Sequence, residues 1–130
     1  MPLTPVNPES LAPPHGYSHG MKGSGELLFV AGQTGVNREG RLVAGDVVGQ
    51  FAQALDNVLD VVWKAGGRPE SLARMVVYVT DKREYRRQAK ELGVAWRKRM
   101  GKHYPAMVLV EVKSLLDDDA LVEVEATAVL

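Results

Sequence analysis

Hydrophobic side chains change their spacing along the chain, and this spacing predicts the secondary structure. From Asp46 onward they recur at three and four residues, which gathers them on one face of a helix. Asp46 is suited to the N-cap of this helix, and the pair Gly66-Gly67 is suited to its end. The apolar positions of the predicted helix are Val47, Val48, Phe51, Leu55, Val58, Leu59 and Val62.

A second helical pattern begins at Asp81, which with Glu84 three positions later resembles a capping box. The sequence predicts a single helix from here to near Gly101, although Gly93 weakens its middle. The apolar face of this predicted helix consists of Tyr85, Ala89, Leu92 and Trp96.

Four other segments are rich in β-branched and apolar residues, as strands are. These segments are residues 26–33, 73–80, 106–112 and 120–130. In the last one, Glu123 and Glu125 alternate with valine and alanine, so the two carboxylates share one strand face. Residues 35–45 are rich in glycine around a polar tip, which predicts a hairpin or loop with Leu42-Val43 as a small pairing strand.

The first fourteen residues contain five of the seven prolines, so this arm is expected to be extended or irregular. The remaining elements follow the order β-β-α-β-α-β-β. That order predicts an α+β fold in which two helices pack on one face of a mixed sheet.

Composition narrows the possible functions. A chain of 130 residues fits one domain, here 1–130, and sixteen basic residues balance sixteen acidic ones. A neutral chain argues against a dedicated nucleic-acid or membrane-surface binder and permits self-association. With no cysteine, no apolar run near the ~18 residues of a membrane span and no secretory start, a cytoplasmic protein is expected.

Candidate chemistry lies in a segment that runs from His15 to Gly20. It contains two imidazoles, a phenol and a hydroxyl, which suit proton transfer but also occur in ordinary polar turns. The sequence places no third ligand near His15 and His19, so no metal site is predicted.

Two further groups of charged residues each have a structural and a functional interpretation. Glu111, Glu123 and Glu125 lie in apolar strands and suit general acid or base chemistry, or they face solvent or a neighbouring subunit. Between Lys82 and Lys102 there are nine basic residues against two acidic ones. This segment is typical of a solvated helix face, with an RNA footprint as the alternative.

Six segments in order along the chain together resemble the RidA/YjgF-like family. They are Gly16-Tyr17-Ser18, residues 28–33, residues 53–58, residues 77–81, residues 103–106 and residues 121–126. The resemblance implies a chorismate-mutase-like fold, a homotrimer with a central barrel, and ligand clefts between subunits. It also implies hydrolysis of reactive enamines and imines to ketoacids and ammonia without a cofactor.

The resemblance also implies which residues form the cleft. Tyr17 and Glu123 match cleft residues of the family, and Gly32 matches the glycine beside them. The family's substrate-carboxylate arginine is replaced by Met107, whose thioether cannot pair with a carboxylate. Two other positions differ from the family pattern, because Ala31 occupies the position of a serine and Ala89 that of an asparagine.

These observations predict a homotrimer that binds a small metabolite, as a divergent imine or enamine deaminase or as a relative with different hydrolytic chemistry. Tyr17, Glu123 and His19 are the candidate catalytic residues, with Glu123 positioning water and His19 relaying a proton. The substrate-binding candidates are Ala31, Gly32, Met107 and Ala89. The alternatives are a non-catalytic ligand-binding or regulatory module and an RNA-interacting protein, either a translation inhibitor or an endoribonuclease.

Overall fold

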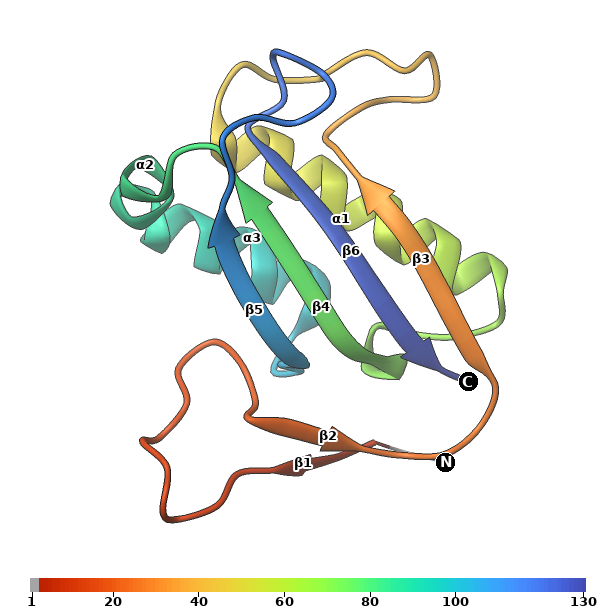
Figure 1. Cartoon of the computed structure of the whole chain (residues 1–130). Coiled ribbons are helices and arrows are strands. Elements are labelled where there is room, and N and C mark those ends of the chain that lie inside the picture. Colours follow the sequence, from red (N-terminus) through yellow and green to blue (C-terminus); the bar gives the residue numbers. More distant parts are fainter. Residues whose placement is uncertain (1–2) are drawn as a thin grey trace.

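A four-stranded mixed sheet forms the centre of the protein (Figure 1), which a computed structural model describes over residues 3–130. The strand order is β3-β6-β4-β5. β3 (Leu27–Gln33) and β4 (Leu72–Val79) both run antiparallel to β6 (Val122–Val129). β5 (Ala106–Glu111) runs parallel to β4 at one edge. All four predicted strands of this sheet are therefore confirmed.

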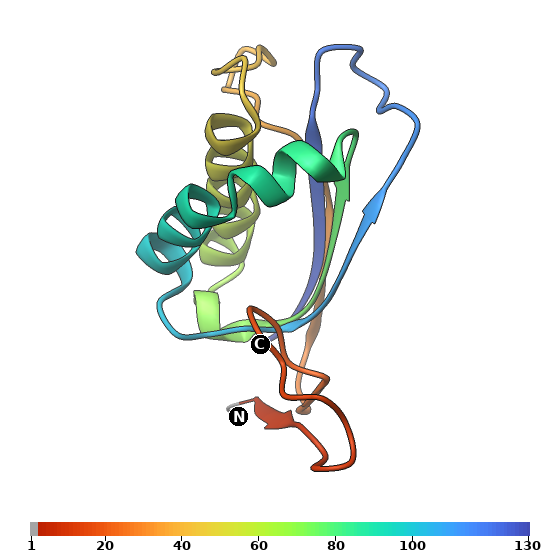
Figure 2. The same ribbon diagram turned by 90° about the vertical axis from the view of Figure 1, so that its left-hand side faces the viewer.

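The helices cover one face of this sheet (Figure 2), which confirms the predicted α+β fold. The long helix α1 (Val47–Lys64) lies across β6 and β3. Beside it lie α3 (Ala89–Met100) and the short η1 (Pro69–Ser71). Asp46 is the N-cap of α1, and Gly66 just beyond its end has φ +90, as the sequence predicts.

The core lies between α1 and the helix-facing residues of the sheet. Every second residue of β6 is buried against α1, and the intervening residues lie on the other face, which we call the open face. Burying one such aliphatic side chain contributes about 1.5–3 kcal/mol, so this layer holds the fold together. The fully buried members include Phe51, Leu55, Val58, Val62, Leu72, Met75, Val77, Val79, Val122 and Val124.

The prediction of a single helix after Asp81 is wrong, because the structure contains two helices there. Asp81 does cap α2 (Lys82–Arg87), and its Oδ1 accepts hydrogen bonds from the backbone N–H groups of Arg83 and Glu84, both at 3.1 Å. The chain then bends at Gln88, where φ is −95 and ψ is 16, before α3 begins. The break therefore lies five residues before Gly93.

The structure also differs from the predicted strand order at the N-terminal end. Within the arm, β1 (Thr4–Val6) and β2 (Gly20–Lys22) form a separate antiparallel pair. Pro5 is compatible with this pairing because β1 is an edge strand, where proline is tolerated. Pro2, another of the arm's prolines, lies outside the described residues. The predicted strand at Leu42-Val43 is reduced to one bridge between Val36 and Leu42.

Gln50 is a buried polar side chain that connects two loops. It is 1 % exposed, and its Nε2 donates to the carbonyl oxygens of Ala44 at 3.0 Å and Asp119 at 3.1 Å. Its Oε1 accepts a hydrogen bond from the backbone N–H of Leu121 at 2.7 Å. The loop before α1 and the loop before β6 are thus fixed to the same helix.

We expect Gln50→Leu to destabilise the protein by about 2–4 kcal/mol, because it leaves a buried N–H and two carbonyl groups without partners. The measurement is urea-induced unfolding followed by circular dichroism. Gln53→Leu, one turn along α1, is the matched control, since the Gln53 side chain donates one bond, to Asn57. An equal loss in both variants would contradict the role given to Gln50.

Candidate functional site

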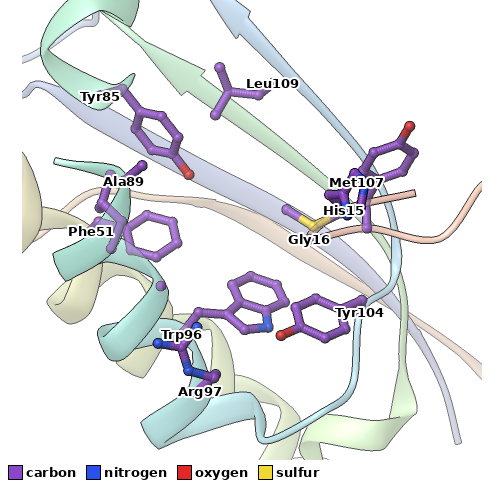
Figure 3. A pocket seen from close by; sticks show the side chains of 13 residues that line it. His15, Gly16, Phe51, Tyr85, Ala89, Trp96, Arg97, Tyr104, Met107 and Leu109 are labelled. Carbon is purple, nitrogen blue, oxygen red and sulfur yellow. The ribbon is translucent and has the colours of Figure 1, made fainter. Parts of the chain in front are cut away.

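A pocket of about 470 Å³ lies where the helices stand away from the edge strand β5 (Figure 3). α3 packs on α1 and η1, and it does not pack closely on β5. The space between them is lined from the helices by Ala89, Gly93 and Arg97, and from the strand by Met107 and Leu109. This volume is typical of small-molecule sites.

Aromatic side chains form much of the pocket wall. The rings of Phe51 and Trp96 stack with centroids 6.4 Å apart, and Trp96 stacks on Tyr104 at 5.9 Å with an angle of 7° between the planes. Tyr85 meets Phe51 edge to face at 6.2 Å. Trp96 is fixed because its Nε1 donates to the carbonyl oxygen of His103 at 3.2 Å. The wall is therefore flat, apolar and held in place from several elements.

Hydrogen bonds from Ser18 bring the arm to this pocket. Its backbone N–H donates to the Pro105 carbonyl at 3.0 Å, and its hydroxyl donates to the Tyr104 carbonyl at 2.6 Å. Ser18 is also bridged to Ala106 in parallel register. Tyr17 consequently lines the pocket together with Met107.

His19 is close to Tyr17 and lies outside the pocket lining. The two rings meet edge to face with centroids 5.3 Å apart. His19 Nε2 lies 2.7 Å from the carbonyl oxygen of Ala12. Because a carbonyl oxygen only accepts, Nε2 carries the proton and Nδ1 is the nitrogen left for a proton relay.

The other cleft candidates, Ala31, Gly32 and Glu123, lie on β3 and β6, away from the pocket. The pairing of β3 with β6 is irregular between Val30 and Gln33, where Ala31 and Gly32 lie. A Cβ on Gly32 would be 2.4 Å from Glu123 Oε2, so a larger residue here would force this carboxylate to shift from its position. Glu123 lies on the open face, while the pocket lies on the helix-covered face.

The remaining strand carboxylates have structural partners. Glu125 accepts a hydrogen bond from the Tyr78 hydroxyl, and this bond raises the pKa of Tyr78 above its usual value. Glu111 is exposed and accepts the backbone N–H of Lys82 at 2.9 Å, at the start of α2. Neither Glu125 nor Glu111 reaches the pocket.

The basic segment forms an exposed surface on α2 and α3, and in residues 3–130 two of its side chains form ion pairs with carboxylates. Arg87 pairs with Glu84, and Arg99 binds Asp56 of α1 through Nε at 2.6 Å and Nη2 at 3.3 Å. Eight of the nine basic residues are exposed, as on a solvated face, and the exception is Arg99.

No cluster of three metal-ligating side chains occurs among residues 3–130. In the same residues, none of the helices is both long enough and apolar enough to span a membrane.

Sequence reasoning missed several pocket residues. Arg97 was counted with the solvated basic residues, and Gly93 was read as a weakness of the helix. A usable signal existed, because these two positions are four residues apart and therefore share a helix face with the pocket residue Ala89. Tyr104 also lines the pocket, as does His15, which belongs to the candidate segment that the sequence indicates.

The mixed sheet, its helical layer and the arm fixed beside β5 define an α+β protein with a small-molecule-sized pocket. A family model described as Endoribonuclease L-PSP matches residues 7–130. The chain belongs to this family, which is the YjgF/RidA family of the resemblance.

Individual relatives agree with this assignment over most of their length. A RutC family protein of Pyrococcus horikoshii is 33 % identical over 113 residues, covering 86 % of this chain and 85 % of the relative. The crystal structure of YyfB from Yersinia pestis, a conserved Rid family protein of unknown function, is 32 % identical with a TM-score of 0.89, and all of both chains is covered. The YjgF gene product of E. coli is 29 % identical with a TM-score of 0.71, covering 95 % of this chain and 91 % of the other.

Burial in the pocket wall raises the pKa of Tyr85 from 10.0 to about 12. Below pH 10 the phenol is neutral in both the folded and the unfolded chain. Between pH 10 and about pH 12 it ionises more readily in the unfolded chain, so the free energy of unfolding falls as pH rises. We expect the Tyr85→Phe variant to lose less stability than the wild type across this interval, as measured by urea unfolding at several pH values. Identical pH profiles for the two proteins would contradict this assignment.

Proposed function

We propose that the protein binds a small organic molecule in the pocket between α3 and β5, and that it hydrolyses an imine or enamine with a flat, apolar side chain. The observation that carries this proposal is the aromatic wall formed by Phe51, Trp96 and Tyr104. Such a wall provides large apolar contacts for a planar group. Met107 extends the same apolar surface where the family has an arginine.

The proposed reaction is the addition of water to a C=N carbon, followed by loss of ammonia, which leaves a carbonyl compound. Tyr17 borders the pocket, and its hydroxyl can donate to the substrate. Glu123 would orient the attacking water and accept one of its protons. His19, whose ring contacts that of Tyr17, would take up at Nδ1 the proton that Glu123 accepts from water and pass it to the nitrogen. The hydroxyl proton of the adduct would follow to the nitrogen as the carbonyl forms and ammonia leaves.

This mechanism needs more than one copy of the chain, because Tyr17 and Glu123 lie on different faces of one sheet. The open face also exposes large apolar side chains, with Phe29 74 %, Leu27 60 % and Val108 46 % exposed. Exposed apolar surface of this kind is typical of an interface between subunits. We therefore propose a homotrimer in which the β3–β6 side of one copy brings Glu123 to the pocket of the next.

The reaction is tested with imines generated in place by an amino-acid oxidase, with ammonia release as the measurement. We expect the wild type to hydrolyse the imine of phenylpyruvate faster than 2-iminopropanoate, because only the former fills the aromatic wall. Met107→Arg should raise turnover of 2-iminopropanoate by roughly 30-fold or more, the effect of restoring a desolvated charge pair.

Glu123→Gln should abolish the enzymatic rate, whereas Glu125→Gln, on the same strand face, should retain it. Binding of phenylpyruvate with no turnover of either imine would refute the hydrolase and favour a ligand-binding module.

The assembly is tested by sedimentation equilibrium at micromolar concentration. We expect a species of about three times the 14.2 kDa chain mass. Phe29→Glu should dissociate it, because a charge would be buried in the interface. Trp63→Glu is the matched control, since Trp63 is 54 % exposed but belongs to α1 on the other side of the sheet. A wild-type species of 14 kDa would refute the trimer.

A further inference from the structure

One arginine reaches the pocket from its helical wall, where Figure 3 shows it beside Trp96. The side chain of Arg97 runs back along α3 and covers Gly93. A Cβ added at Gly93 would lie 3.1 Å from Arg97 Nη1 and 3.7 Å from Cζ and Nη2. This direction is usual for long side chains on a helix, which point toward its N-terminus. The bare backbone at Gly93 thus gives the guanidinium room at the edge of the pocket.

The charge of Arg97 has no acidic partner in the described part of the chain. The ion pairs found over residues 3–130 are Glu84–Arg87 and Asp56–Arg99, and Arg97 takes part in neither. No aspartate or glutamate is among the described residues that line the pocket, and Arg97 is the permanently charged one. A ligand in this pocket therefore meets one permanently positive group together with the imidazole of His15 and an otherwise apolar and phenolic surface.

We infer that Arg97 is the anion-binding residue of this pocket, and that the ligand is a carboxylate with a flat apolar body. This inference rests on the proposed function, which supplies the ligand. The guanidinium offers paired N–H donors in a plane that matches a carboxylate, and its positive charge strengthens both bonds. The apolar body lies against Phe51, Trp96 and Tyr104, where burial of its surface is favourable.

The position of this charge differs from that expected from the family resemblance. There the arginine would stand on β5 at position 107, whereas Arg97 belongs to α3 across the pocket. Met107 then forms part of the apolar end of the site. The site is therefore not limited to neutral substrates by the loss of the β5 arginine, because α3 supplies a positive charge.

The test compares two probes of the same shape, phenylacetate and the neutral phenylacetamide. Binding is followed by the fluorescence of Trp96, which is 6 % exposed, in a Trp63→Phe background that leaves one tryptophan. We expect phenylacetate to bind roughly threefold to tenfold more tightly than the amide, the range for one partly exposed charge-assisted contact. Arg97→Gln should remove this preference, and Arg97→Lys should retain part of it.

Lys98→Gln is the matched control, because Lys98 carries the same charge on the next position of α3 and does not line the pocket. It should leave the preference unchanged. Equal affinity for the two probes in the wild type, or a preference that survives Arg97→Gln, would overturn the role of Arg97 and leave the pocket in place. Absence of saturable binding by either probe would overturn the proposed small-molecule function itself. Arg97 is exposed, so its replacement leaves the core intact.

Discussion

The packing of α1 across β6 and β3 determines where the rest of the structure lies. Its buried face supplies Phe51, whose ring contacts both Trp96 of α3 and Tyr85 of α2. The ion pair between Arg99 and Asp56 adds a second contact between α3 and α1. Because α3 is held against α1 and not against β5, a gap remains beside the edge strand. The pocket is therefore a consequence of the way the core is packed.

Local signals in the sequence were sufficient for most of the fold. The apolar side chains of α1 recur at three and four residues, and this spacing predicts a helix because its buried face is continuous. The alternation around Glu123 predicts which residues of β6 face the helices and which lie on the open face. The bend at Gln88 was not predictable in this way, since no proline or glycine stands there and its neighbours form helices on both sides. The pairing of β1 with β2 was also missed, because it joins residues 14 to 18 positions apart across a proline-rich arm.

The candidate site was predictable only in part, and for a related reason. Ser18 binds the carbonyl of Tyr104, 86 positions away, so nothing local in the sequence places Tyr17 beside Met107. The family resemblance supplied that proximity, and the structure has both residues in one pocket. Arg97 was not found because a charge on an amphipathic helix is usually solvated. Its spacing from Gly93 and Ala89 places it on the same helix face, and the structure adds that its guanidinium lies over Gly93.

A change of one charged residue can alter a binding site without altering its shape. With an arginine on β5, the anionic end of a ligand would point to the strand and its apolar end to the helices. With Met107 on β5 and Arg97 on α3, the positive charge lies on the helical side of the pocket beside Trp96, so the proposed carboxylate would point toward α3 instead of toward β5. The reacting carbon would then lie at a different depth relative to Tyr17. The chain's total charge is zero in either case, so under the proposed function the local placement of Arg97, and not the net charge, would select the carboxylates that bind.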